Sequence, residues 1–234
     1  MPASITIPAR LNGPLENGNG GYSAGILAGF LEGAAEVRLR RPVPLDRELV
    51  VEQPAPSRAL ALDGEDLIME GRSVEAPDVQ PPDPVSPEEA RTASRRYRGL
   101  AEGTFSRCFV CGRAREDAFG VFAGAVDGRA VVASPWMPPA WTADESGVVR
   151  PEFVWAVLDC PTYFALYQEG DLPMSVLAQI TGEVRNPVRS GVEHVVIAWP
   201  IGIDGRKGHA GSAVLSADGE VLALARALLI ELRP

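Results

Sequence analysis

The sequence has no excess of positive charge and no long apolar run, and each absence excludes a class of partner. Acidic residues number 31 against 22 lysines and arginines, which leaves a formal net charge of -9. A nucleic-acid binder usually carries a basic excess, because its affinity comes largely from neutralising phosphates. No stretch reaches the roughly 18 consecutive apolar residues of a membrane-spanning helix. We therefore expect neither nucleic acid nor membrane as a partner.

Cysteine is also scarce. Three cysteines, at positions 108, 111 and 160, are too few and odd in number for the disulfide framework of a small secreted protein. Residues 1–8 lack the basic and then apolar order of a secretory signal. These absences predict a reducing, cytoplasmic setting. Apolar residues make up 46% of the chain, which suffices to bury a core and excludes disorder throughout.

A proline-rich segment separates two stretches of the chain. Residues 77–87 carry five prolines and no apolar periodicity, which is typical of an extended linker. Within Ser86-Pro87-Glu88-Glu89, an N-cap, a proline at the first helical position and acids in the first turn predict a short, mostly exposed helix to about Tyr97. We therefore divide the chain into a first repeat (1–76), a linker with a short helix (77–103) and a second repeat (104–234).

Each repeat is predicted to contain one helix followed by about four strands. In the first repeat, a small-residue helix over 20–31 precedes strands at 36–40, 49–52, 58–62 and 66–74. In the second, a hairpin (120–126 and 129–133) and a loop (134–149) precede an apolar segment at 153–167 and strands at 177–185, 193–199, 209–216 and 221–232. The Asp-Gly pairs at 63–64, 127–128 and 218–219 mark the hairpin turns.

The two stretches also resemble each other in sequence. Residues 37–43 (VRLRRPV) resemble 183–188 (EVRNPV), and residues 60–65 resemble 214–220. One helix followed by antiparallel strands is an α+β pattern, and a lone sheet around one helix leaves an edge strand open. We therefore expect the two sheets to join edge to edge.

Four motifs resemble those of the hotdog-fold acyl-CoA thioesterases. Residues 19–28 (NGGYSAGILA) and 41–44 (RPVP) resemble the family's His-Gly-Gly helix start and its Arg-Pro-Val-Pro strand. Residues 108–112 (CFVCG) resemble its Cys-x-x-Cys-Gly lead-in, and residues 153–161 resemble its central helix with an acid near the middle. The likeness covers most of residues 5–76 and 104–233. It implies a double hotdog, in which each of two repeats wraps an antiparallel sheet around a central helix, as in the tandem acyl-CoA thioesterases.

Neither repeat carries the complete family site. The first has Asn19 in place of the histidine and no acid at the matching position, near Ala28. The second has Asp159, but residues 150–152 (RPE) replace the His-Gly-Gly turn. The resemblance therefore implies a composite site that combines Gly20 and Gly21 of one repeat with Asp159 of the other.

The residue types at this site suit thioester hydrolysis. Asp159 is alone among apolar residues over 153–166, and desolvation raises the pKa of a carboxyl group toward the range useful for a general base. Alternatively, Asp159 caps a helix that restarts at residues 160–161. Gly20 and Gly21 at a helix start offer backbone N–H groups to an oxyanion, or merely let the helix pack closely on the sheet.

Four further residues are assigned to substrate binding. Asn19 caps the helix or donates to the substrate carbonyl, and capping is the interpretation we favour. Tyr22 lies in the same helix start. Arg185 and Arg189 contact phosphates of CoA or are simply solvated. The segment 204–209 has the Asp and His spacing of a hydratase motif of other hotdog enzymes, but Arg206 replaces its asparagine and a turn is predicted there, so we treat it as coincidence.

No metal and no cofactor are expected. Cys108 and Cys111 have the spacing of zinc ligands, but a closed zinc site needs four ligands. Cys160 belongs to the central helix, and His194 and His209 belong to separate strands. A pair of reduced thiols in a turn is therefore the interpretation we favour.

Two functions remain open. The first is hydrolysis of an acyl-CoA thioester to the free acid and CoA. The second is binding of an acyl group or acyl-CoA by a protein that kept the fold and lost the full site. The implied partner is an acyl-CoA or a related thioester in both cases, and homo-oligomerisation is left open.

Overall fold

One antiparallel sheet dominates the computed structural model, which describes residues 3–99, 102–103 and 105–233. Residues 1–2, 100–101, 104 and 234 lie outside the described residues. They include the start of the first predicted repeat, two residues of the predicted linker, and the first and last residues of the second predicted repeat. Among the described residues the sheet has 11 strands in the order β1-β3-β4-β5-β2-β8-β11-β10-β9-β7-β6. The predicted α+β class and the predicted joining of strands from both stretches are confirmed.

The elements follow the predicted order along the chain. Before the linker lie β1 (Ala3–Thr6), α1 (Gly20–Ala28), β2 (Ala34–Leu39), β3 (Glu48–Ala55), β4 (Arg58–Asp63) and β5 (Asp66–Val74). After it lie α2 (Pro87–Ser94), β6 (Gly124–Ala125), β7 (Val132–Trp136), α3 (Pro151–Leu166), β8 (Ser175–Val184), β9 (His194–Asp204), β10 (Lys207–Leu215) and β11 (Val221–Glu231). β9 and β10 meet at a turn around Gly205, as predicted for the segment 204–209.

β1 was not predicted from the sequence, and α2 ends at Ser94 where a helix to about Tyr97 was predicted. Two further elements differ more. α1 ends at Ala28, three residues earlier than predicted, because the N–H groups of Phe30 and Leu31 donate to carbonyls three residues back, at 3.1 and 2.9 Å, which is the pattern of a tighter turn. The hairpin predicted over 120–133 is reduced to a short pairing of β6 with β7. Instead of continuing that strand, the chain before β6 bonds to the cysteine loop, where Val121 N–H donates to the Val110 carbonyl at 3.1 Å.

Apart from β6, a strand of 2 residues at one edge, the sheet has the same strand order from both sides. Inward from one edge, the strands are β1, β3, β4, β5 and β2, and from β7 inward they are β7, β9, β10, β11 and β8. The two runs meet where residues 35–38 of β2 pair with residues 179–182 of β8. This central pairing joins strands from before and after the linker into one surface.

Matching hydrogen bonds also hold the starts of α1 and α3. The N–H groups of Asn19 and Arg150, the residues before α1 and α3, donate to the carbonyls of Leu11 at 3.1 Å and Thr142 at 3.0 Å. One residue earlier, the N–H groups of Gly18 and Val149 donate to the carbonyls of Val43 at 2.9 Å and Val188 at 2.8 Å. The start of α1 is therefore bonded to the chain before it and to the segment after β2. The start of α3 is bonded in the same way to the chain before it and to the segment after β8.

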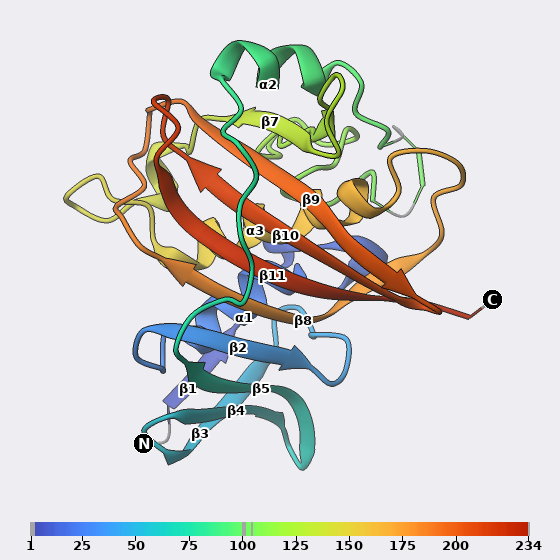
Figure 1. Cartoon of the computed structure of the whole chain (residues 1–234). Helices are drawn as coiled ribbons and strands as arrows, with labels where there is room; N and C mark the ends of the chain where they lie inside the picture. The colour runs from blue at the N-terminus through green and yellow to red at the C-terminus, as the bar shows by residue number, and fades with distance from the viewer. Residues whose placement is uncertain (1–2, 100–101, 104, 234) are drawn as a thin grey trace.

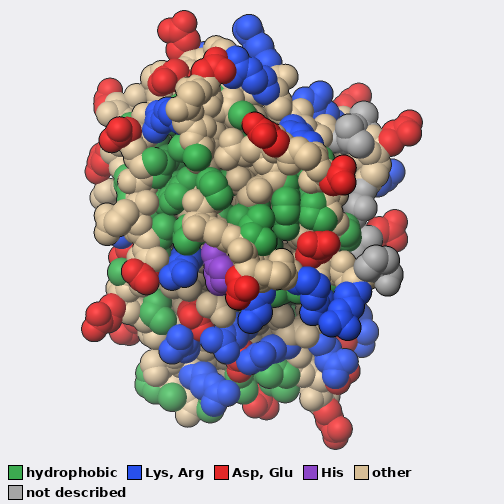
Figure 2. All heavy atoms as spheres, turned by 45° about the vertical axis from the view of Figure 1, so that its right-hand side comes forward, with side chains coloured by type: hydrophobic (Ala, Val, Ile, Leu, Met, Phe, Trp, Pro, Cys, Tyr) green, Lys and Arg blue, Asp and Glu red, His purple; other side chains and the backbone are tan. Residues whose placement is uncertain are grey.

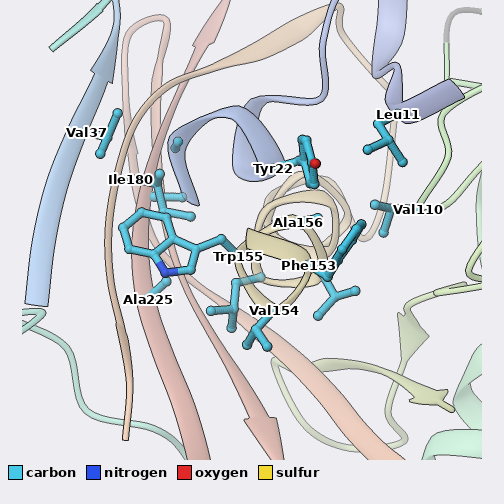
Figure 3. Packing of buried hydrophobic residues seen from close by; sticks show 14 of the residues in the cluster. Leu11, Tyr22, Val37, Val110, Phe153, Val154, Trp155, Ala156, Ile180 and Ala225 are labelled. Atoms are coloured by element: carbon cyan, nitrogen blue, oxygen red, sulfur yellow. The ribbon is translucent and has the colours of Figure 1, made fainter. Parts of the chain in front are cut away.

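The core lies between the sheet and the two long helices. α3 runs behind β9, β10 and β11 in Figure 1, and α1 lies against it and beside β2. Figure 3 shows Trp155 of α3 pointing toward the sheet, near Ile180, while Phe153 points the other way, toward Tyr22 of α1. Apolar side chains therefore cover most sides of α3, which explains why its sequence is apolar almost throughout.

The linker and α2 cover the opposite face of the sheet. The chain after β5 crosses in front of the sheet in Figure 1 and leads to α2, which packs on β7. The predicted capping box is present, since Ser86 accepts from the Glu89 N–H and the Glu89 side chain accepts from the Ser86 N–H. None of the helices in the described residues is long and apolar enough to cross a membrane.

Candidate active site

Asp159 of α3 meets the start of α1. Its side chain is buried, with 9% of its surface exposed, and its Oδ2 accepts a hydrogen bond of 2.9 Å from the Gly21 N–H. α3 continues through Pro161 to Leu166, so Asp159 lies inside the helix. The alternative prediction, that Asp159 caps a helix restarting at residues 160–161, is wrong. Proline removes only one intrahelical donor, and the packing of α3 on most of its sides holds the helix together across that gap.

Gly21 is required by the close approach of the two helices. A Cβ at Gly21 would lie 2.4 Å from the carbonyl oxygen of Trp155 and 2.6 Å from the Cβ of Asp159. A Cβ at Gly20 would lie 2.9 Å from the Cδ2 of Leu177 and 3.2 Å from the Oδ2 of Asp159. Gly21 thus approaches helix α3, whereas Gly20 approaches Leu177 of β8 first, so the alternative interpretation of close packing on the sheet holds at Gly20 only.

The two glycine N–H groups have different partners. The Gly21 N–H is occupied by Asp159 and holds the carboxylate in place. The Gly20 N–H has no hydrogen-bond acceptor among the described residues, as is usual for the first residue of a helix. Gly20 also lines a cavity, and as the first residue of α1 it lies at the positive end of the helix dipole. Of the two predicted oxyanion donors, Gly20 is the one left available.

Asn19 caps α1, which confirms the favoured interpretation. Its Oδ1 accepts a hydrogen bond of 2.9 Å from the Tyr22 N–H. Because Oδ1 is engaged in this bond, the Nδ2 group points away from the helix, toward the sulfur atoms of Cys108 at 3.8 Å and Cys160 at 3.6 Å. Asn19 therefore connects the helix start to the cysteines.

A cavity of about 300 Å³ opens beside Asp159 and Gly20. Its walls are mainly apolar, which suits an acyl group. The apolar residues include Leu39, Val43, Phe105, Tyr163, Phe164 and Leu177. Burial raises the pKa of Asp159 to about 7, although the hydrogen bond from Gly21 acts in the opposite direction. The site thus combines the Asp159 carboxyl group, whose pKa lies near neutrality, the Gly20 N–H, which has no acceptor among the described residues, and an apolar cavity.

All three cysteines lie on the wall of this cavity. Their sulfur atoms lie within 4.8 Å of one another, and the sulfurs of Cys108 and Cys160 are 3.6 Å apart. Hydrogen bonds from the thiols of Cys111 and Cys160 hold the pKa of the Cys108 thiol well below its ordinary value. From the sequence, Cys160 was placed in the central helix and was not predicted to lie at the site. Its position directly after Asp159 was a signal for this, because a site built on Asp159 brings the next residue into the same region.

Three residues assigned to substrate binding do not line the cavity in the described structure. Tyr22 lies two positions after Gly20, on the other side of α1, where its ring packs 5.2 Å from that of Phe153. Arg185 follows the last residue of β8, whereas the cavity is lined by the strand's first residues, roughly 25 Å away along an extended strand. Arg189 donates instead to the Ser146 carbonyl at 3.0 Å.

Two other arginines stand at the cavity. Arg40 and Arg41, directly after β2, are among its lining residues and have side chains 47% and 57% exposed. Arg40 pairs with Glu70, and Arg41 pairs with Asp66. Figure 2 shows basic side chains gathered on the lower part of one face, with acidic side chains among them. The sequence presents these arginines only within the segments 37–43 and 41–44, and it contains no signal that they line a cavity.

Comparison with solved structures identifies the fold. The tesB protein of Mycobacterium avium subspecies paratuberculosis matches 95% of this chain and 91% of its own, with a TM-score of 0.59 and 16% identity. A candidate thioesterase of Novosphingobium aromaticivorans matches 98% and 95%, with a TM-score of 0.66 and 11% identity. A hotdog-fold protein of unknown function from Alicyclobacillus acidocaldarius matches 99% and 93%, with a TM-score of 0.63 and 12% identity. No protein-family model matches the chain, and no curated protein matches its sequence.

Proposed function

Starting from the hotdog fold, which this chain shares with proteins of the thioesterase superfamily, we propose that the protein hydrolyses an acyl thioester, with acyl-CoA as the substrate. The observation that carries this proposal is the meeting of Asp159 with the start of α1 at the wall of an apolar cavity. The resemblance at residues 19–21 and 153–161 supports it, because these motifs supply the two parts that meet.

The residues have distinct roles in the proposed reaction. The acyl group occupies the apolar cavity, and the thioester carbonyl oxygen accepts from the Gly20 N–H, where charge develops during attack. Asp159 removes a proton from the attacking water, and the Gly21 N–H holds the carboxylate in the required orientation. The C–S bond then breaks, and the leaving thiolate takes the proton back from Asp159. The products are a carboxylic acid and a thiol.

We further propose that the chain is a double hotdog, with repeats over 1–76 and 104–234 and a linker over 77–103. The common strand order inward from β1 and from β7 supports this division. The matching hydrogen bonds at the starts of α1 and α3 support it independently, because they relate the same positions in each repeat. In this arrangement the site is composite, with Gly20 and Gly21 from the first repeat and Asp159 from the second.

Arg40 and Arg41 are the residues we propose for the phosphates of CoA. They are exposed at the cavity, where the part of the substrate beyond the thioester leaves the protein. Arginine recognises phosphate through several donors in a fixed geometry. This assignment replaces that of Arg185 and Arg189.

A second candidate is acyl-CoA binding without turnover. It is favoured by Asn19, which stands where the family motif has histidine and whose amide is already engaged with Tyr22 and the cysteines. An assay of acyl-CoA esters of several chain lengths with a thiol reagent distinguishes the two functions. Release of CoA that is lost in Asp159→Asn and kept in the exposed control Asp218→Asn supports hydrolysis. Saturable binding with no release in the unaltered protein supports the binding function.

A further inference from the structure

The three cysteine sulfurs form a triangle of the size that a metal ion requires. They lie within 4.8 Å of one another, and one edge, between Cys108 and Cys160, measures 3.6 Å. Zinc binds thiolate sulfur at about 2.3 Å, so two sulfurs in a tetrahedral site lie about 3.8 Å apart. The observed triangle needs only small side-chain adjustments to reach this geometry.

The loop over residues 108–112 is shaped to present two of these sulfurs. Its two cysteines are separated by two residues, the spacing of chelating pairs in zinc sites. The Gly112 N–H donates to the Cys108 carbonyl at 2.8 Å and closes the loop. A Cβ at Gly112 would lie 2.4 Å from the Ser106 carbonyl oxygen and 2.5 Å from that of Cys108, so this tight turn requires glycine.

The third sulfur comes from a different part of the chain and is held independently. Cys160 is fixed by α3, whose packing against α1 places it opposite the loop. The Asn19 Nδ2 group points at the sulfurs of both Cys108 and Cys160. An N–H group aimed at two sulfurs stabilises negative charge on them, and metal-binding cysteines are thiolates.

We propose that Cys108, Cys111 and Cys160 bind one zinc ion whose fourth coordination position opens into the cavity. All three residues line the cavity. Asp159 does not belong to the group of ligand atoms that converge among the described residues, so the fourth ligand comes from solution. Three protein ligands with one open position are the arrangement of a reactive zinc site, in contrast to the closed four-ligand site. No metal was expected from the sequence because only Cys108 and Cys111 were counted as possible ligands and Cys160 was assigned to the central helix.

Metal content tests the proposal without reference to activity. Protein purified with a reductant and without chelator is expected to contain about one zinc per chain. Cys108→Ser, Cys111→Ser and Cys160→Ser each are expected to lower the zinc content severalfold. His209→Ala is the matched control, because it removes a metal-binding side chain on β10 that does not line this cavity, and its zinc content is expected to stay unchanged.

Cobalt replacement gives a second test that does not depend on variants that fold. Co²⁺ added to the zinc-free, reduced protein is expected to give the intense near-ultraviolet charge-transfer absorption of thiolate ligands. A small thiol added afterwards is expected to shift the visible cobalt bands, because it enters the open position. Bands that do not respond overturn the open fourth position.

Two results overturn the metal site itself. One is reduced protein that takes up neither zinc nor cobalt while all three thiols remain titratable after unfolding. The other is protein that contains a Cys108–Cys160 disulfide and no metal when purified without reductant, and that still takes up no metal after reduction. Because neither measurement uses an acyl thioester, failure of the proposed hydrolysis leaves this result unaffected.

Discussion

The starts of α1 and α3 occupy matching places in the fold but differ in chemistry. α1 begins with Asn19, Gly20 and Gly21, and α3 begins with Arg150, Pro151 and Glu152. The first start offers the Gly20 N–H, which has no acceptor among the residues that the structure describes. The second has proline at the same place, which has no N–H to offer, and then a carboxylate. An oxyanion is therefore favoured at the first start and disfavoured at the second.

The two helices also differ in whether they carry an acid at the matching position. Asp159 lies nine residues after Arg150, and the position nine residues after Asn19 is Ala28. Aromatic packing occupies the second start, where Arg150 lies 4.9 Å from the ring centre of Phe153 and that ring lies 5.1 Å from that of Trp141. One start thus kept the groups that suit catalysis, while the other contributes packing. The predictions below test this division, beginning with the largest effect.

Replacement of Asp159 is expected to have the largest effect on turnover. Asp159→Asn keeps the size and an acceptor for the Gly21 N–H but removes the base. We expect kcat to fall by ~10²–10⁴-fold with little change in acyl-CoA binding. Glu152→Gln at the other start is the control, and it is expected to keep nearly full activity. Full turnover of Asp159→Asn would leave the two starts without a catalytic difference.

The same replacement is expected to stabilise the protein. Burial raises the pKa of Asp159 in the folded state to about 7, from about 3.8 for an aspartate in water, so the folded state holds this proton more tightly. Stability is therefore lost as the pH rises through this interval, and Asp159→Asn removes the loss. We expect a gain on the order of 1–3 kcal/mol at pH 8, seen as a higher melting temperature, and almost none near pH 4. An equal gain at both pH values would contradict this cause.

The two glycines of the first start are expected to differ from each other. Gly21→Ala places a Cβ against the rigid backbone of α3, at 2.4 Å from the Trp155 carbonyl oxygen. Gly20→Ala meets the flexible end of Leu177 at 2.9 Å. We expect Gly21→Ala to lose roughly 1–3 kcal/mol or more and Gly20→Ala clearly less, measured by denaturant unfolding. Comparable losses would show that the helices separate easily at this point.

Local rules explain which parts of the structure were predictable from the sequence. The turns at Asp-Gly pairs, the capping box at Ser86 and the cap by Asn19 depend on neighbours within a few residues, and all are present. The meeting of Asp159 with Gly21 joins residues from two halves of the chain, and it was expected only through the resemblance. No periodicity encodes such a contact.

The errors arose where tertiary packing decided the outcome. Pro161 suggested a helix boundary, but packing carries α3 across it. Tyr22 was grouped with its sequence neighbours, although helical rotation turns it away from the cavity. The convergence of Cys160 with the cysteine loop depends on the crossing of α1 and α3, which two glycines with no side chains permit.

The smallest expected difference concerns the residues that precede the two helices. Asn19 accepts a hydrogen bond from the Tyr22 N–H, whereas the Arg150 side chain caps nothing and lies over the ring of Phe153. Asn19→Ala is expected to cost about 1 kcal/mol, because it leaves a helix N–H without its partner. Arg150→Ala is expected to cost roughly 0.5 kcal/mol, because it removes the cation–π contact and two long hydrogen bonds, to the carbonyls of Thr142 and Trp141, at an exposed site. Denaturant unfolding of both variants in a chelator, which removes any contribution of metal at the cysteines, measures this difference. Equal costs would show that the cap of α1 contributes no more than the ring contact of α3, and the cysteine-facing amide of Asn19 would then be the only distinctive feature of that residue.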